Sequence, residues 1–244
     1  MNIIKLDATE STNSFLKELS VNSTISSYTV VVANKQTSGR GQMNTTWVSE
    51  ANKNLLCSVY ITFDDFPIHQ QVYLNFAIAI AIHEALLTLK LPNLEIKWPN
   101  DILSDKKKIC GILVENILKG NKIMASIVGI GVNVNQEKFP EDLPNASSIK
   151  NCVGKEVEID EVLAHIIAQL KNKIALLESK KYVLLQKEYE SILHKKNVPS
   201  MFKDTENVLF MGKILGVNTI NGNLRIELAD ETIKEFGLKE VSFL

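Results

Sequence analysis

Thr37-Ser38-Gly39-Arg40-Gly41-Gln42 is the stretch around which the sequence is organised, and Trp47 follows it closely. It lies between two apolar, β-branched runs, residues 28–33 and 55–63, which predict strands because such side chains suit a pleated, half-buried surface. The connection between them is too long for a tight hairpin turn. Its glycines let backbone N–H groups approach a ligand, and Arg40 adds a fixed positive charge. The pattern fits an anion-binding loop, with a plain surface loop as the alternative.

The composition is that of a globular protein without an overall charge bias. The chain has 244 residues, with 27 Lys+Arg against 28 Asp+Glu, so no net field steers it to DNA or to an anionic membrane. The N-terminus lacks a signal-peptide pattern, and the most apolar stretch, residues 76–89, is too short to span a bilayer. Cys57, Cys110 and Cys152 have no paired spacing, which fits a reducing compartment. We therefore expect a cytoplasmic protein.

Hydrophobic periodicity predicts alternating strands and helices, followed by a small all-β segment. We expect strands at 3–6, 28–33, 55–63, 94–98 and 123–135, a hairpin through 99–115, and helices at about 69–90, 160–178 and 180–195. The composition changes near residues 197–199. Short strands are expected at 208–217, 224–228 and 232–236, with Asn221-Gly222 as a hairpin turn.

Two clusters of small or polar residues indicate ligand contacts as well as structure. Ser11-Thr12-Asn13 precedes a helical pattern, where one residue, Thr9 or Ser11, suffices as a cap and the others can face a polar ligand. In the run 127–135, glycine and asparagine recur on alternate positions. Small residues on one side of a strand leave the space that a pocket requires.

Several common catalytic motifs are missing from the sequence. The four histidines are scattered and no Cys-x-x-Cys occurs, which argues against a metal centre made from protein ligands. Neither a Gly-x-Ser-x-Gly elbow nor a Walker loop occurs. Arg40 and Lys108 remain as a potential cationic clamp for phosphate and carboxylate oxygens. Asp101 could hold the Mg²⁺ that phosphate chemistry usually needs.

Five motifs in order give the chain a recognisable resemblance. They are Glu10-Ser11-Thr12-Asn13, Gln36-x-x-Gly39-Arg40-Gly41-Gln42-x-x-x-x-Trp47, Lys97-Trp98-Pro99-Asn100-Asp101, Lys108 to Glu115, and Gly129-Ile130-Gly131-Val132-Asn133-Val134-Asn135. Together they resemble the biotin protein ligases and cover the first ~150 residues. The resemblance implies an α+β fold with a mixed-sheet catalytic domain of the biotin/lipoate protein ligase type at 1–196. The remainder, 197–244, would be a small C-terminal SH3-like β-barrel.

The resemblance also assigns roles to individual residues. Lys108 and Arg40 would be catalytic, and Asp101 would hold Mg²⁺. The biotin-binding residues would be Ser11, Thr12, Asn13, Gln36, Gly39, Arg40, Gly41, Gln42, Lys108, Gly111 and Leu113. The residues that bind ATP or the adenylate would be Arg40, Gln42, Trp47, Asn100, Asp101, Lys108 and Asn133.

The loop departs from the family pattern at two places. Gln42 stands where many members have a second arginine, and Met43-Asn44 stands where an arginine-glycine pair is common. Gln42 keeps hydrogen bonding but loses charge, so retention of the adenylate is expected to rest more heavily on Arg40 and Lys108.

The implied reaction is the ATP- and Mg²⁺-dependent activation of biotin as biotinyl-5′-AMP, followed by transfer to a lysine of a biotin carboxyl carrier protein, for example that of acetyl-CoA carboxylase. We expect no DNA binding, no repressor function and no membrane partner, because the charge is balanced and the chain begins close to the first catalytic strand. A monomer and a homodimer both remain open. The alternatives are a lipoate or octanoate ligase, which shares the fold, and a non-catalytic biotin- or nucleotide-binding module.

Overall fold

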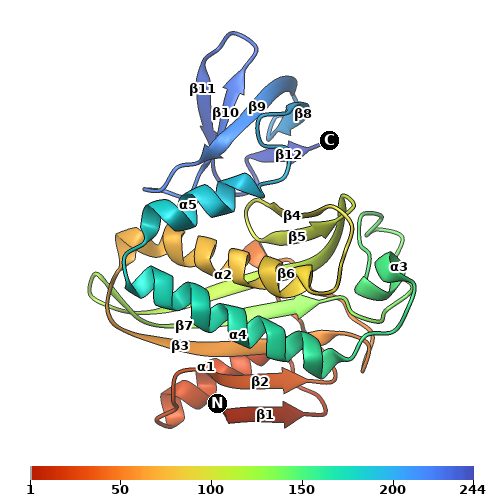
Figure 1. The fold of residues 1–244 in the computed structure, drawn as a ribbon, viewed down its shortest axis with the longest axis vertical. Coiled ribbons are helices and arrows are strands. Elements are labelled where there is room, and N and C mark those ends of the chain that lie inside the picture. The colour runs from red at the N-terminus through yellow and green to blue at the C-terminus, as the bar shows by residue number, and fades with distance from the viewer. Residues whose placement is uncertain (1) are drawn as a thin grey trace.

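The larger of two β-sheets forms the framework of the protein. The computed structural model describes residues 2–244 (Figure 1). The seven strands of this sheet lie in the order β1 (Asn2–Leu6), β2 (Thr29–Ala33), β3 (Leu55–Pro67), β7 (Lys122–Val132), β6 (Lys107–Lys119), β5 (Asp101–Ser104) and β4 (Leu94–Lys97). β1 and β2 pair in parallel and every other neighbouring pair is antiparallel, so the predicted mixed sheet is confirmed.

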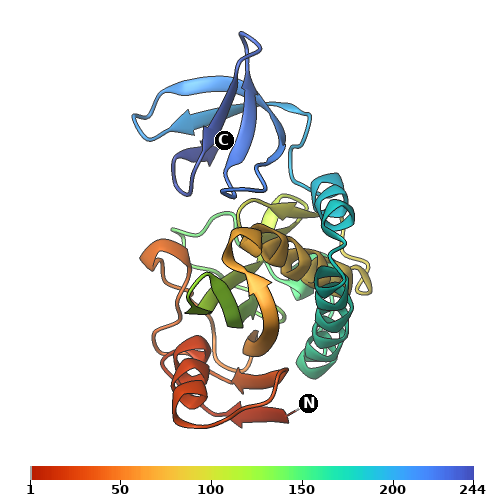
Figure 2. The same cartoon turned by 90° about the vertical axis from the view of Figure 1, so that its left-hand side faces the viewer.

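Helices cover the two faces of this sheet unequally. α2 (Gln71–Leu87) and α4 (Ile159–Glu178) pack on one face, with α5 (Tyr182–Ser191) against α2, and α1 (Thr12–Asn22) lies on the other (Figures 1 and 2). α2 is buried on nearly all sides, as its continuous apolar pattern predicts. On the opposite face, Leu16 of α1 packs against Val31 and Ile127. Three short helices complete the set: η1 (Gln42–Asn44), η2 (Ile68–Gln70) and α3 (Ile149–Val153).

The C-terminal strands form a second, separate sheet. Its order is β11 (Ile233–Phe236), β10 (Leu224–Leu228), β9 (Leu209–Val217), β8 (Pro199–Asp204) and β12 (Val241–Phe243), and all pairs are antiparallel. Phe202 and Phe210 stack inside it with Phe236. This arrangement confirms the predicted small barrel-like appendage. The division of the chain at residue 197 stays a prediction.

The sequence-based boundaries were wrong at a few places. The helix expected at 180–195 ends at Ser191, because Leu193 forms a bridge to Ile96 and the His194 N–H donates to the Ile96 carbonyl, 2.8 Å away. The chain thus leaves the helix to join the sheet edge. β8, β12 and α3 were not predicted, and the β9–β10 connection runs from residue 218 to 223 instead of being a two-residue turn.

The C-terminal sheet touches the first at two of the sequence motifs. The indole N–H of Trp98 donates to the Gly222 carbonyl at 3.0 Å. Lys97 places its ammonium 4.9 Å from the centre of the Phe243 ring. Lys239 donates to the Met43 carbonyl, 2.9 Å away, in the glycine-containing loop 37–47. We call this loop the lid.

The Lys239 contact predicts that the C-terminal sheet holds the lid in place. An exposed hydrogen bond contributes about 0.5–1 kcal/mol, so Lys239→Ala should raise the rate of proteolytic cleavage within residues 40–47 by about threefold. Lys234→Ala is the matched control, because Lys234 is also an exposed lysine of this sheet but stacks on Phe236 instead. Equal cleavage rates in the two variants would contradict this role.

Candidate functional site

A cavity of about 610 Å³ lies between the α1 side of the large sheet, the lid and the C-terminal sheet. Most residues with a predicted ligand role line it: Ser11, Thr12, Asn13, Gln36, Arg40, Gly41, Gln42, Trp47, Asn100, Asp101, Lys108, Gly111 and Leu113. These residues come from four separate motifs, and the strand order of the sheet brings them together. Their individual roles stay predictions.

One end of the cavity is built from uncharged hydrogen-bonding groups at the start of α1. Gln36 Oε1 accepts from the Thr12 N–H at 2.8 Å and from the Thr12 hydroxyl at 3.1 Å. Buried Ser58 lies 2.7 Å from the Thr12 hydroxyl and 2.6 Å from Asn13 Oδ1. Ser11 occupies the N-cap position, but its hydroxyl makes no capping bond. Of the two capping candidates, Thr9 and Ser11, Ser11 does not cap the helix through its side chain, and its hydroxyl is therefore free to face a ligand.

Arg40 is the cation beside this polar end. Its guanidinium pairs with Glu115 and donates to the Ser14 hydroxyl at 3.1 Å. Burial raises the pKa of Glu115, but hydrogen bonds from Arg40 and Asn13 outweigh burial and hold that pKa below its usual range. Glu115 thus remains ionised and orients Arg40 toward the cavity side of α1.

Glycines form the floor of the cavity. Gly111 of β6 and Gly131 of β7 face each other across the strand pair, and the Trp47 ring lies over both. A Cβ at Gly131 would stand 2.6 Å from the Trp47 ring, and one at Gly129 would stand 2.4 Å from Asn13 Oδ1. The space predicted beside β7 is therefore present, and the lid tryptophan and the α1 amide occupy it.

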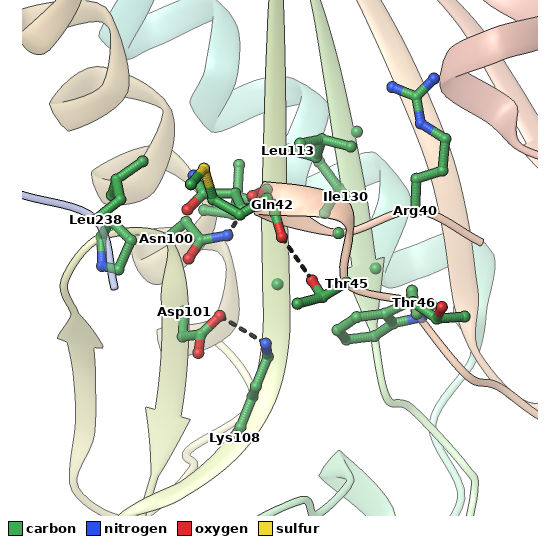
Figure 3. Close-up of a pocket in the computed structure, with 18 of the residues that line it drawn as sticks. Arg40, Gln42, Thr45, Thr46, Asn100, Asp101, Lys108, Leu113, Ile130 and Leu238 are labelled. Carbon is green, nitrogen blue, oxygen red and sulfur yellow. Dashed lines mark hydrogen bonds and ion pairs between the residues drawn. The ribbon is translucent and has the colours of Figure 1, made fainter. Parts of the chain in front are cut away.

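Lys108 is the second cation of the cavity. Its ammonium lies 2.7 Å from an oxygen of Asp101, across the β5–β6 pair (Figure 3), and 5.4 Å from the centre of the Trp47 ring. Its neighbours Lys106 and Lys107 are instead exposed at the tip of the hairpin. Asp101 and Lys108 therefore form a charge pair at the cavity wall, where ligand oxygens can take the place of the carboxylate.

Hydrogen bonds within the lid hold its central turn together. Gly41 N–H donates to the Thr45 carbonyl at 2.7 Å, and the Thr45 hydroxyl donates to the Gln42 carbonyl at 2.8 Å (Figure 3). Between them, Asn44 has a φ of 62°, in the left-handed region. Asparagine tolerates this conformation better than other residues with a side chain, so it can stand where the family pattern has glycine.

Two predicted residues lie outside the cavity lining. Gly39 is a buried residue of the lid itself, and its carbonyl accepts from the backbone N–H of Trp47 at 2.9 Å. Asn133 is also buried, and its amide donates to the Ser147 carbonyl at 2.9 Å. Its Oδ1 has no hydrogen-bond partner within residues 2–244. Asn133 does not line the cavity, so its contact with an adenylate stays a prediction.

The structure adds functional candidates to which the sequence analysis assigned no role. Ser58 is a polar residue between apolar neighbours in the first half of β3, and this local contrast was the available signal. Lys97 lies in the cavity wall, where burial lowers its pKa. Leu238 and Lys239 reach the cavity from the C-terminal sheet, and no local pattern relates them to it.

Other kinds of site receive no support from the described part of the chain. Within residues 2–244, no group of three or more His, Cys, Asp or Glu side chains is arranged to hold a metal ion. The helices of that range are also too short or too polar to cross a membrane.

Comparisons with known proteins agree with this geometry. The model of the biotin/lipoate A/B protein ligase family matches residues 6–133. The bifunctional ligase/repressor BirA of Bacillus subtilis is 31% identical over 237 residues, which span 96% of this chain and 71% of that protein. A biotin–[acetyl-CoA-carboxylase] ligase of Paracoccus denitrificans is 34% identical over 164 residues, or 66% of this chain and 64% of its own.

Solved structures extend the similarity to the whole chain. The biotin protein ligase of Aquifex aeolicus, in complex with biotin and ATP, superposes with a TM-score of 0.79 at 27% identity. That alignment covers 100% of this chain and 98% of the other, so it includes the C-terminal sheet. The chain belongs to the biotin/lipoate A/B protein ligase family.

Proposed function

We propose that this protein activates biotin with ATP as biotinyl-5′-AMP and transfers the biotinyl group to a lysine of a biotin carboxyl carrier protein, such as that of acetyl-CoA carboxylase. The observation that supports this most directly is the layout of one cavity. A neutral hydrogen-bonding end at Thr12 and Gln36 continues into a region with two cations, Arg40 and Lys108. This order matches a ligand with a neutral ring, a carboxylate and then a phosphate.

The first step brings two anions together, which is the main barrier that the protein has to lower. The biotin carboxylate attacks the α-phosphorus, the bond to the bridging oxygen breaks, and pyrophosphate leaves with the electron pair. Lys108 and Arg40 are held by Asp101 and Glu115 before a ligand enters. Cations that are already oriented stabilise the charge that builds at phosphorus without further reorganisation.

The neutral end selects the ring. The Ser11 hydroxyl, the Thr12 side chain and Gln36 offer both donors and acceptors, as a ureido group requires. Ser58 fixes Thr12 and Asn13 from below, so this arrangement is rigid before binding. Trp47 and the glycine floor supply a flat apolar surface next to it.

Mg²⁺ would arrive with ATP. Asp101 is the carboxylate in the cavity lining, and Mg²⁺ commonly binds through one carboxylate together with substrate phosphates. Asp101 therefore fits the role of the protein ligand, and Mg²⁺ would neutralise phosphate charge there.

The second step transfers the biotinyl group from the adenylate to a lysine amine and releases AMP, and the lid protects the adenylate until then. Biotinyl-AMP is a mixed anhydride that water destroys, so closure of the lid over it prevents loss. We further propose a cytoplasmic ligase, monomeric or homodimeric, without repressor function. The support for the last point is the charge balance of 27 Lys+Arg against 28 Asp+Glu, which provides no basic surface field for DNA.

Calorimetry with biotin, followed by pyrophosphate release with ATP, tests this function. Biotin-dependent pyrophosphate release supports it. Pyrophosphate release that depends on lipoate or octanoate instead of biotin would favour the alternative that the protein is a lipoate or octanoate ligase. Biotin binding without pyrophosphate release would favour a non-catalytic binding module.

Lys108→Ala should lower the rate of biotin-dependent pyrophosphate release by about 10²–10³, since one preorganised cation is lost, while the fold is retained. Lys107→Ala is the matched control, because Lys107 is the exposed neighbour outside this cavity. Near-wild-type turnover in Lys108→Ala would overturn the role of Lys108.

Arg40→Gly should release biotinyl-AMP into solution, because the lid loses its link to Glu115 and its charge contact with the adenylate. The measurement is biotinylation of a bystander protein without a carrier domain. Arg40→Lys retains the charge without the forked geometry and should show an intermediate amount. Strict fidelity to the carrier in Arg40→Gly would contradict the lid assignment.

A further inference from the structure

A second chamber of about 230 Å³ lies beside the main cavity, between the two sheets. Its walls come from the start of α2, from β6 and from the β9–β10 turn of the C-terminal sheet. Gln42, Trp98, Pro99, Asn100, Ile112 and Leu238 line both spaces. The chamber therefore adjoins the main cavity and shares a wall with it; Figure 3 shows two residues of this wall, Asn100 and Leu238, on one side of the main cavity.

The two spaces differ in charge. The main cavity contains Arg40, Lys97, Lys108 and Lys239, with Asp101 as the carboxylate in its lining. In contrast, none of the residues that line the side chamber, all within the described range 2–244, is charged. Its buried lining is apolar, with Val72 and Phe76 among others, and its more exposed lining includes the carboxamides of Gln71, Asn75 and Asn223.

We propose that this side chamber is the entry channel for the acceptor lysine of the carrier protein; this inference rests on the proposed function. A lysine ammonium would be repelled by the cations of the main cavity, so the acceptor has to arrive as the neutral amine. An uncharged, largely apolar channel disfavours the ammonium form, and carboxamide oxygens accept the N–H groups of the amine.

The chemistry at the inner end of the channel is balanced without any further reagent. The amine lone pair forms the C–N bond to the acyl carbon, and the bond from that carbon to the phosphate oxygen breaks. AMP leaves with the electron pair, and one amine proton passes to water. Beside the chamber, Glu235 accepts from the side-chain amides of Asn218 and of Asn221, a lining residue, at 2.7 and 3.0 Å. These hydrogen bonds lower its pKa, so it stays anionic and favours the approach of a lysine.

Two substitutions from opposite walls test the channel. In Asn75→Lys the new side chain would enter the chamber from α2, and in Asn223→Lys it would enter from the side of the C-terminal sheet. Both place a long cationic side chain in the chamber and should slow single-turnover transfer from biotinyl-AMP to the carrier domain by about tenfold or more, because the added side chain fills part of the channel and its charge repels a carrier lysine that still holds its proton. Asn172→Lys on the exposed side of α4 is the matched control.

Two further readouts separate this inference from the proposed function. Pyrophosphate release should be unchanged in both variants. Transfer to hydroxylamine, a small nucleophile that needs no channel, should also stay at the wild-type rate. Carrier transfer at the wild-type rate in both variants would overturn the channel, and equal slowing of hydroxylamine and carrier would do so as well. Absence of pyrophosphate release in the wild type would instead contradict the proposed function.

Discussion

The pairing of Gly111 with Gly131 across β6 and β7 is the constraint on which the site depends. In the same register, Leu113 lies opposite Gly129, so two glycines of β7 present bare backbone on the α1 face. The Trp47 ring and the Asn13 amide occupy the space that side chains would otherwise fill. The lid and the start of α1, which are remote from β7 in sequence, thereby meet at one surface. Larger residues at these positions would push both away.

The electrostatics of the cavity depend on this meeting point. Two of the four cations that line the cavity have a carboxylate partner: Glu115 pairs with Arg40, and Asp101 pairs with Lys108. Partly buried cations without partners would repel each other and destabilise the unliganded protein. With partners they stay in position, and anionic ligand oxygens can compete for them. The side chamber differs from this cationic cavity in having an uncharged lining, and in our proposal it gives the acceptor lysine a neutral path to the adenylate.

Much of this arrangement could be predicted from the sequence, because its signals are local. The Arg40 loop, the Lys108 hairpin and the glycine alternation of β7 each carry a recognisable pattern, and all lie at the cavity. Contacts made only by tertiary packing could not be predicted. Nothing near Lys239 relates it to Met43, 196 positions away, and Ser58 gave no sign of its contact with Asn13. The end of α5 was misplaced for the same reason, since Ile96 of a distant strand draws the chain out of the helix.

The central claim is that one cavity both activates biotin and passes it to a carrier lysine. The most direct test is mass spectrometry of a biotin carboxyl carrier domain after incubation with the protein, biotin and MgATP, with a lipoyl domain present as a competitor. We expect a single biotinyl group on one lysine of the carrier and none on the lipoyl domain. An unmodified carrier, despite biotin-dependent pyrophosphate release, would contradict the claim.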